Sequence, residues 1–343
     1  MTLVRSVEDR IVARLAGSYP LADTYVHEAL VADMEAITLR VSPLVEEATG
    51  LDLPGEPTTA VVGRVEWVER NVASFSHMVE PVRVQMEERL ARAGRDPDMA
   101  GRVIQRETSL ILAILSQRVL GQYELVLPGG EPGDTVTYLG ANILQMERRH
   151  HFVPSEFRFW VALHELTHRA QFQGVPWLRD YFNGLVRRLV EASKPEPGRW
   201  QRVVAELAER RLAGRPLIDQ RGVLGLFATP EQSEVVDQVQ ALMSLLEGHG
   251  HYVMDRLGAE HLRSQSRMSR ILKDRRLDKR TAAFFRLTGL EMKMEQYRQG
   301  EKWVAAVERE ASWETVKLAF SSPHALPNLD EIAHPSRWLA RVA

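Results

Sequence analysis

Residues 164–168 read His-Glu-Leu-Thr-His, a pattern whose residue types and spacing point directly to chemistry. In a helix, His164 and His168 project from one face about one turn apart, because they are four residues apart. Two imidazoles at that separation can bind a single zinc ion. Glu165 lies on the flank of the same helix, where its carboxylate can reach a water on the metal without being a ligand. The pattern therefore predicts a zinc site with a carboxylate base beside it.

The predicted reaction depends on these residue types. Zinc lowers the pKa of a bound water to about 7 and polarises a carbonyl group. A carboxylate can take the proton of that water and deliver it to a leaving amine, which is the role expected of Glu165. The alternative is a chance match in which these polar residues belong to a helix core. Burying two histidines and a glutamate without a partner would be costly, so the metal hypothesis is favoured.

A third metal ligand has to come from His, Asp or Glu, because the chain contains no cysteine. The segment 241–255, ALMSLLEGHGHYVMD, is the best source. As a helix it places Glu247 and His251 one turn apart on a common face, whereas His249 points elsewhere. We favour Glu247 as the ligand and His251 as a residue that orients the site, with His251 as the alternative ligand. Glycines 248 and 250 disfavour a helix by about 1 kcal/mol each, which indicates close approach of another backbone or of the histidine helix.

The elements that must hold these residues are mainly helices, according to the three- and four-residue spacing of apolar positions. Residue 155 is the predicted N-cap of the motif helix, which Gly174 and Pro176 terminate. A loop is expected at 51–59 and an irregular tail after Ser321. The predicted helices cover about 6–16, 21–47, 61–79, 81–93, 97–120, 155–173, 177–193, 198–213, 231–258, 281–298 and 300–311.

Two strands are predicted at 122–127 and 134–139, on either side of a turn rich in Gly and Pro. They form the one convincing strand pair of the sequence. Residues 136–139 could serve as an edge strand that pairs with an extended peptide, or they could be part of a purely structural hairpin.

The overall composition is that of a globular protein of 343 residues with a net charge of -2. Near-neutral charge gives no general attraction to nucleic acid or membranes, so neither partner is expected. Charges interrupt the first residues, which lack the apolar core of a signal peptide, and a cytoplasmic location is the default expectation. We expect an N-terminal helical region, 1–121, packed on a catalytic region, 122–343, with one compact domain overall as the alternative.

Three further features have a functional and a plain structural interpretation. Tyr297, Tyr252 or His251 could stabilise an oxyanion near the metal, although such tyrosines more often pack in a core. His150 and its neighbour at 151 could form a second metal site, but a solvated turn is favoured. The basic run 263–280 could attract an acidic ligand, but a solvated helix face is favoured.

Several stretches of the chain resemble the zincin-like metallopeptidase type 2 family, whose members carry labels as hydrolases or as proteins associated with deazaflavin-coenzyme biosynthesis. The stretches are HELTHRAQFQGVPWLRDYF (164–182), SLLEGHGHYVMD (244–255) and GLEMKMEQYRQGEKWV (289–304), with GRVEWVERNVASF (63–75) and VLGQYELVLPG (119–129) upstream. The resemblance implies a mainly α fold with a small β hairpin or sheet, built on a gluzincin-type metallopeptidase core with an N-terminal helical region.

The same resemblance implies a residue-by-residue assignment of the site. It implies Zn²⁺ as the cofactor, with His164, His168 and the Glu that precedes Gly, here Glu247, as its ligands. It also implies Glu165 as the catalytic residue. Related zincins often carry an Asp four residues after the ligand Glu to orient the first His. This chain has His251 there instead, so the orienting role is left open.

The function predicted from these residues is a zinc-dependent hydrolase that cleaves an amide bond, with a peptide as the first choice of substrate. One alternative keeps the metal but acts on a small amide related to cofactor metabolism. Another is a binding or scaffold protein that the metal stabilises without turnover. Glu165 argues against the scaffold, which would need the histidines but not that carboxylate.

Overall fold

A computed structural model of the chain describes residues 7–19, 21–92, 94, 96, 98–126, 132–192, 230–276 and 291–342. The chain divides into two compact units. The first contains residues 1–176 and 256–265, and the second contains 177–255 and 266–343. The predicted division at residue 121 stays a prediction.

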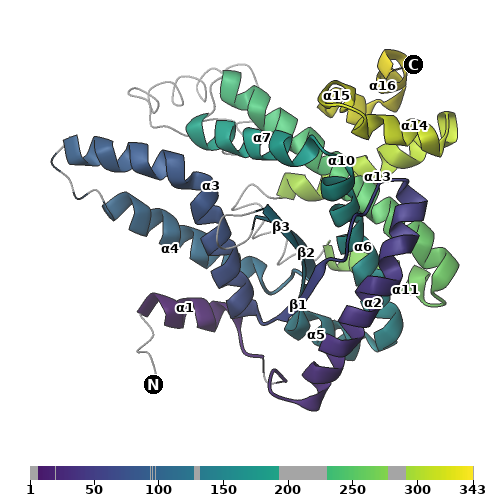
Figure 1. Ribbon diagram of the computed structural model, residues 1–343, viewed down its shortest axis with the longest axis horizontal. Coiled ribbons are helices and arrows are strands. Elements are labelled where there is room, and N and C mark those ends of the chain that lie inside the picture. Colours follow the sequence, from purple (N-terminus) through teal and green to yellow (C-terminus); the bar gives the residue numbers. More distant parts are fainter. Residues whose placement is uncertain are drawn as a thin grey trace, which may run out of the picture. The chain divides into compact units, whose positions relative to one another are not determined.

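A three-stranded sheet lies at the centre of the first unit (Figure 1). It consists of β1 (Thr58–Val62), β2 (Gly121–Val126) and β3 (Pro132–Leu139) in the order β1-β3-β2. Strands β2 and β3 are antiparallel, which confirms the predicted hairpin. Strand β1 pairs with β3 in parallel and was not predicted, since 51–59 reads as a loop and the next helix was expected from 61.

The central position of β3 corrects one expectation. Both of its sides are paired, one with β1 and the other with β2. Residues 136–139 therefore offer no free edge to an extended peptide. Within this sheet, β1 and β2 are the edge strands.

Helices cover both faces of this sheet. They are α1 (Val7–Ala16), α2 (Tyr25–Thr49), α3 (Arg64–Arg92), α4 (Asp98–Leu115), α5 (Gly140–His150) and α6 (Pro154–Gly174). Successive strand residues point to opposite faces. Accordingly, the Tyr123 ring stacks on Phe172 of α6, while Gln122 accepts a hydrogen bond from Trp67 of α3. Helix α2 packs along α6, so the motif helix lies between a long helix and the sheet.

In the first unit, three differences from the predicted helices bear on the fold. Helix α3 continues through Pro81 instead of breaking there, and α5 was not predicted. Helix α6 has Val153 as its N-cap, not Ser155, and Pro154 occupies the first helical position. Proline suits that position, because its fixed φ fits the helix and its missing N–H would have no partner within the helix.

The second unit is helical. Its elements are α7 (Leu178–Ala192), α10 (Pro230–His261, whose last residues belong to the first unit), α11 (Gln265–Arg276), α13 (Glu291–Glu310), α14 (Trp313–Lys317), η1 (Leu318–Phe320), η2 (Pro323–Ala325), α15 (Leu329–Ala333) and α16 (Pro335–Val342). The tail expected to be irregular is thus a series of short helices. Their core contains Trp303 and Trp338, whose rings meet edge to face.

Two predicted helices, ending at 298 and starting at 300, are parts of the single helix α13. The predicted helix at 198–213 and residues 281–290 lie outside the described residues.

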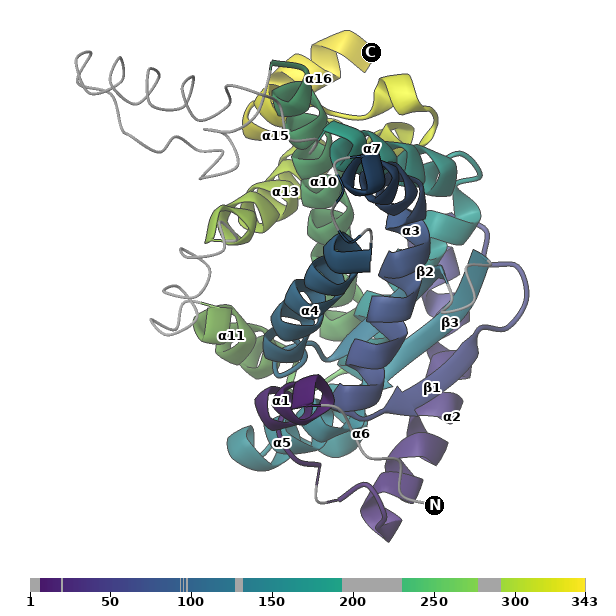
Figure 2. The ribbon, with the colours of Figure 1, turned by 90° about the vertical axis from the view of Figure 1, so that its left-hand side faces the viewer.

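Helices α10 and α13 lie so close at one crossing that only glycine fits (Figure 2). A Cβ atom on Gly248 would overlap the backbone of Gly300, and a Cβ on Gly300 would overlap the carbonyl of Ser244. This confirms the expectation that a glycine beside Glu247 marks the approach of another backbone. Among the described residues, no helix is long and apolar enough to span a membrane.

Candidate metal centre

The motif helix α6 brings its two histidines together as the four-residue spacing predicts. The Nε2 atoms of His164 and His168 lie 3.2 Å apart, and the ring centroids are 4.6 Å apart with the planes nearly perpendicular. Both side chains are half-buried. Two ring nitrogens therefore meet at one point on the helix surface, as two ligands of a single ion would.

Gln171 determines which nitrogen of His168 carries the hydrogen. Its side-chain oxygen lies 2.9 Å from Nδ1 of His168. An amide oxygen can only accept, so Nδ1 donates and the lone pair of the neutral ring is on Nε2. A ligating histidine commonly has its second nitrogen held in this way. The donor chemistry of this pair therefore fits a zinc ion.

Glu165 is buried beside the first residue of β2. A Cβ atom added to Gly121 would lie 2.6 Å from Cγ and 2.8 Å from Oε1 of Glu165. Tyr138, which pairs with Gly121 across the sheet, is also close. Burial raises the pKa of the Tyr138 phenol, and the negative charge of Glu165 raises it further. The carboxylate thus lies on the sheet side of α6.

Arg169 fixes the same stretch of α6 to the segments around it. Its guanidinium is fully buried and donates two hydrogen bonds to the carboxylate of Asp134, at 2.7 and 2.8 Å. It also donates to the carbonyl oxygens of Pro54 and Gly55. A paired, two-pronged contact of this kind holds a helix in a defined orientation, because the guanidinium is planar and rigid.

Helix α10 presents Glu247 and His251 one turn apart, as predicted. The Nδ1 atom of His251 donates to the backbone carbonyl of Glu247 at 2.8 Å, which leaves the lone pair of the neutral ring on Nε2. His249 points elsewhere, as predicted. Its ring stacks on Trp313 at 5.5 Å and meets Phe320 edge to face at 5.0 Å.

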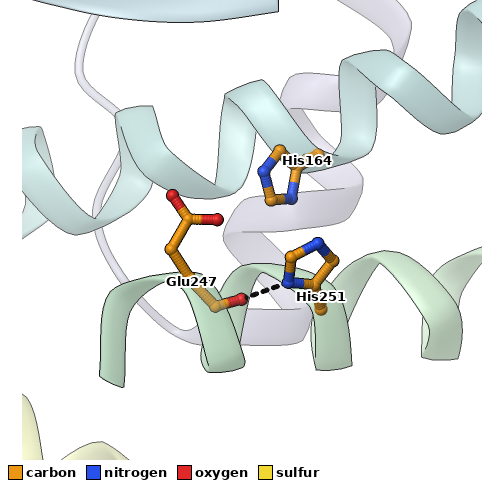
Figure 3. A group of neighbouring side chains, drawn as sticks. All are labelled: His164, Glu247 and His251. Carbon is orange, nitrogen blue, oxygen red and sulfur yellow. Dashed lines mark hydrogen bonds between the residues drawn. The ribbon is translucent and has the colours of Figure 1, made fainter. Parts of the chain in front are cut away.

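Figure 3 shows His164 together with Glu247 and His251. One ligand atom from each residue lies within 4.8 Å of the others. Two imidazoles and a carboxylate are donors that zinc accepts readily. Among the described residues, this group does not include His168, whose Nε2 lies 3.2 Å from that of His164. The group therefore contains two of the predicted ligands, His164 and Glu247, together with the alternative ligand His251.

The other predicted candidates have different surroundings. The Tyr252 hydroxyl donates to Glu308, and its ring stacks on Trp313 at 5.9 Å. Tyr297 belongs to α13, but its side chain lies outside the described residues. The His150 ring stacks on Phe152 at the end of α5. In the described part of the chain, the metal-ligand group contains neither His150 nor its neighbour.

Two residues near the site escaped the sequence-based prediction. Gln171 lies in the helix three residues after His168, and that spacing is a usable signal for a partner of a ligating histidine. Gly121 directly precedes the predicted strand 122–127 and is the first residue of β2, and a glycine in a strand often marks the close approach of another group. The glycine signal does not identify its partner, Glu165, because that contact depends on how α6 packs on the sheet.

Comparisons with known proteins show the family of the chain and a similar solved structure. None of the curated proteins matches the chain. The chain is similar to a solved structure, described as the "crystal structure of a putative hydrolase with a novel fold from Chloroflexus aurantiacus". The two share 27% sequence identity, with a TM-score of 0.72, over 97% of this chain and 96% of the other. The family model for zincin-like metallopeptidases matches residues 6–339, so the chain belongs to the zincin-like metallopeptidase family.

Proposed function

We propose that this protein is a zinc-dependent hydrolase that cleaves an amide bond, with a peptide as substrate. In this proposal His164, His168 and Glu247 bind the metal, and Glu165 is the general base. The observation that carries the proposal is the group formed by His164, Glu247 and His251, next to a buried Glu165. The similar solved structure from Chloroflexus aurantiacus is described as a "putative hydrolase".

The course of α10 supports Glu247 as the third ligand. Within the first unit, the end of α10 and the residues after it run antiparallel to α6. A Cβ on Gly258 would lie 3.2 Å from the ring of Trp160, and the Ser264 amide donates to Glu156 at 2.9 Å. Helix α10 is continuous from 230 to 261. On α10, His251 and Glu247 precede Gly258 by seven and eleven residues, and on α6 His164 and His168 follow Trp160 by four and eight residues.

Each side chain of the proposed site has a separate chemical role. When bound, zinc supplies Lewis-acid polarisation of the substrate carbonyl and acidifies a water molecule. Glu165 accepts the proton of the attacking water and then delivers it to the leaving amine. Gln171 keeps the Nε2 lone pair of His168 available. His251, whose Nδ1 donates to the Glu247 carbonyl, keeps the Nε2 lone pair of its neutral ring available.

A scaffold protein with a metal but no turnover is the second candidate, and the position of His251 favours it. If His251 binds the metal together with His164, His168 and Glu247, four protein ligands complete a tetrahedral site. Such closed sites are structural, whereas catalytic zinc keeps one position open. The two candidates therefore differ in the role of one imidazole.

Metal analysis combined with a cleavage assay tests the proposal. Wild type and Glu165→Gln are purified without chelators, their zinc content is measured, and both are screened against a library of quenched fluorescent peptides. We expect about one zinc per chain in both proteins and cleavage by wild type alone. The exposed Glu314→Gln serves as the matched control. Absence of metal from the wild-type protein would overturn the proposal, and zinc without cleavage by wild type would favour the scaffold.

A further inference from the structure

Gly121 occupies a position where a side chain would collide with the proposed base. It is the first residue of β2 and lies opposite Tyr138 in β3. An added Cβ would lie 2.6 Å from Cγ, 2.8 Å from Cδ and 2.8 Å from Oε1 of Glu165. These separations are well inside van der Waals contact, which is about 3.5–4.0 Å between carbon atoms. Glu165 therefore uses the space that a Cβ would otherwise fill.

The backbone of β2 does not itself require glycine here. Gly121 is absent from the glycines with positive φ, which in the described residues are Gly17, Gly50, Gly55 and Gly94. In a strand, glycine is also less favourable than residues with a side chain, because it loses more conformational freedom on folding and packs nothing. The reason for glycine at this position is thus steric, and the three atoms nearest to an added Cβ all belong to Glu165.

The surroundings leave the Glu165 carboxylate little freedom to move away. Glu165 is 5% exposed. The nearby Tyr138 is fully buried, and its hydroxyl is 3.0 Å from the Thr38 hydroxyl of α2. The charge of Glu165 raises the pKa of this phenol in addition to the effect of burial, which indicates that the carboxylate is close to it. A Cβ at 121 would therefore displace the carboxylate from the position it now holds.

We propose that Gly121 is a positioning residue that reserves the space for the Glu165 carboxylate. The proposal rests on the function proposed above, because it assumes that Glu165 acts on the substrate. The three atoms nearest to an added Cβ belong to this one side chain and not to backbone. Gly121→Ala is therefore expected to affect the position of the base more than the stability of the fold.

The first test separates catalysis from metal binding. For the best peptide that wild type cleaves, we expect Gly121→Ala to lower kcat at least 10-fold and to change KM less than about twofold. The reason is that misplacing a catalytic group by about 1 Å can lower the rate about 100-fold. Its zinc content should equal that of wild type. Gly63→Ala is the matched control, since the nearest atom to its added Cβ is 3.9 Å away. Wild-type kcat in Gly121→Ala would overturn the inference.

The second test needs no activity. Gly121→Ala is made in wild type and in Glu165→Ala, and the melting temperatures of all four proteins are compared. Because the three atoms nearest to the added Cβ all belong to Glu165, the alanine should lower the melting temperature of wild type but not that of Glu165→Ala. If Gly121→Ala fails to fold, the double variant should still fold. Equal shifts in both backgrounds, or a double variant that fails to fold, would overturn the inference. Wild-type turnover by Glu165→Ala would instead overturn the proposed function and leave this cycle intact.

Discussion

Gln171 and His168 are joined by a hydrogen bond of 2.9 Å between the amide oxygen and Nδ1, within the helix that carries the metal-binding motif. The bond connects a fully buried amide to a half-buried imidazole. It fixes both the tautomer and the ring orientation of His168, because an amide oxygen accepts only from a protonated nitrogen. The metal affinity of the site should therefore depend on a residue that does not touch the metal.

Replacing Gln171 tests this dependence. We expect Gln171→Leu to weaken zinc binding about 10–100-fold, the usual effect of losing a partner of a ligating histidine. Gln171→Glu keeps an acceptor on Nδ1 and should retain affinity close to that of wild type. Competition with a chromogenic chelator measures both constants. Equal affinities for Gln171→Leu and wild type would show that the hydrogen bond does not prepare His168.

The glycine crossing of α10 and α13 should be intolerant of any side chain. We expect Gly300→Ala to reduce the free energy of unfolding by about 3 kcal/mol or more, because its Cβ would meet backbone rather than a movable side chain. Gly184→Ala in α7 is the matched control, with no atom within 4 Å of the added Cβ. It should stabilise by about 0.4–1 kcal/mol. Urea unfolding measures both changes, and a harmless Gly300→Ala would contradict the tight crossing.

The acid sensitivity of the second unit should depend in part on Glu331. Burial alone would raise its pKa, but hydrogen bonds from Arg341 and from the Asn328 amide outweigh burial and lower it. A carboxylate with a lowered folded-state pKa stabilises the fold above its unfolded pKa, and this stabilisation is lost as the pH falls through the folded pKa. Glu331 thus contributes at neutral pH and not in acid.

We therefore expect Glu331→Gln to cost about 1–2 kcal/mol at pH 7, since it weakens a capping box and a two-pronged ion pair. The difference between variant and wild type should shrink below about pH 4, where the wild-type carboxylate is protonated. Thermal unfolding at several pH values measures this. The exposed Glu314→Gln should cost less than about 0.5 kcal/mol. A difference that persists unchanged at pH 3 would refute the linkage.

The parts of the site that were predictable from sequence are those that one helix determines. The spacing of His164 and His168, the common face of Glu247 and His251 and the separate direction of His249 follow from 3.6 residues per turn. Local composition also predicted the β2–β3 hairpin, because a short turn rich in Gly and Pro separates two β-branched segments. These features need no knowledge of the rest of the fold.

The parts that escaped prediction depend on partners far along the chain. Strand β1 is five residues long, and it forms because β3, more than seventy residues later, accepts it in parallel. A local pattern carries no information about such a partner. The role of Gly121 likewise requires knowing that β2 crosses α6 at Glu165. Tyr138, which pairs with Gly121, lies near Glu165 because of the same packing. From the sequence it was predicted only as part of the strand 134–139.

The role of His251 separates a catalytic site from a closed one, and two substitutions resolve it. We expect Glu247→Ala to lose zinc, because it removes one of three ligands. His251→Ala should retain zinc and lower kcat about 10²–10³-fold, because a protonated His251, which donates from both ring nitrogens, would stabilise the developing negative charge. The exposed His334→Ala, at the end of α15, controls for removal of an imidazole. Zinc content by atomic absorption and kcat on one peptide are measured for all three.

If His251→Ala loses zinc as completely as Glu247→Ala, the imidazole is a ligand. A fourth protein ligand would occupy the coordination position that a water needs. The chain would then hold its metal in a closed site, and Glu165 would have no water to deprotonate.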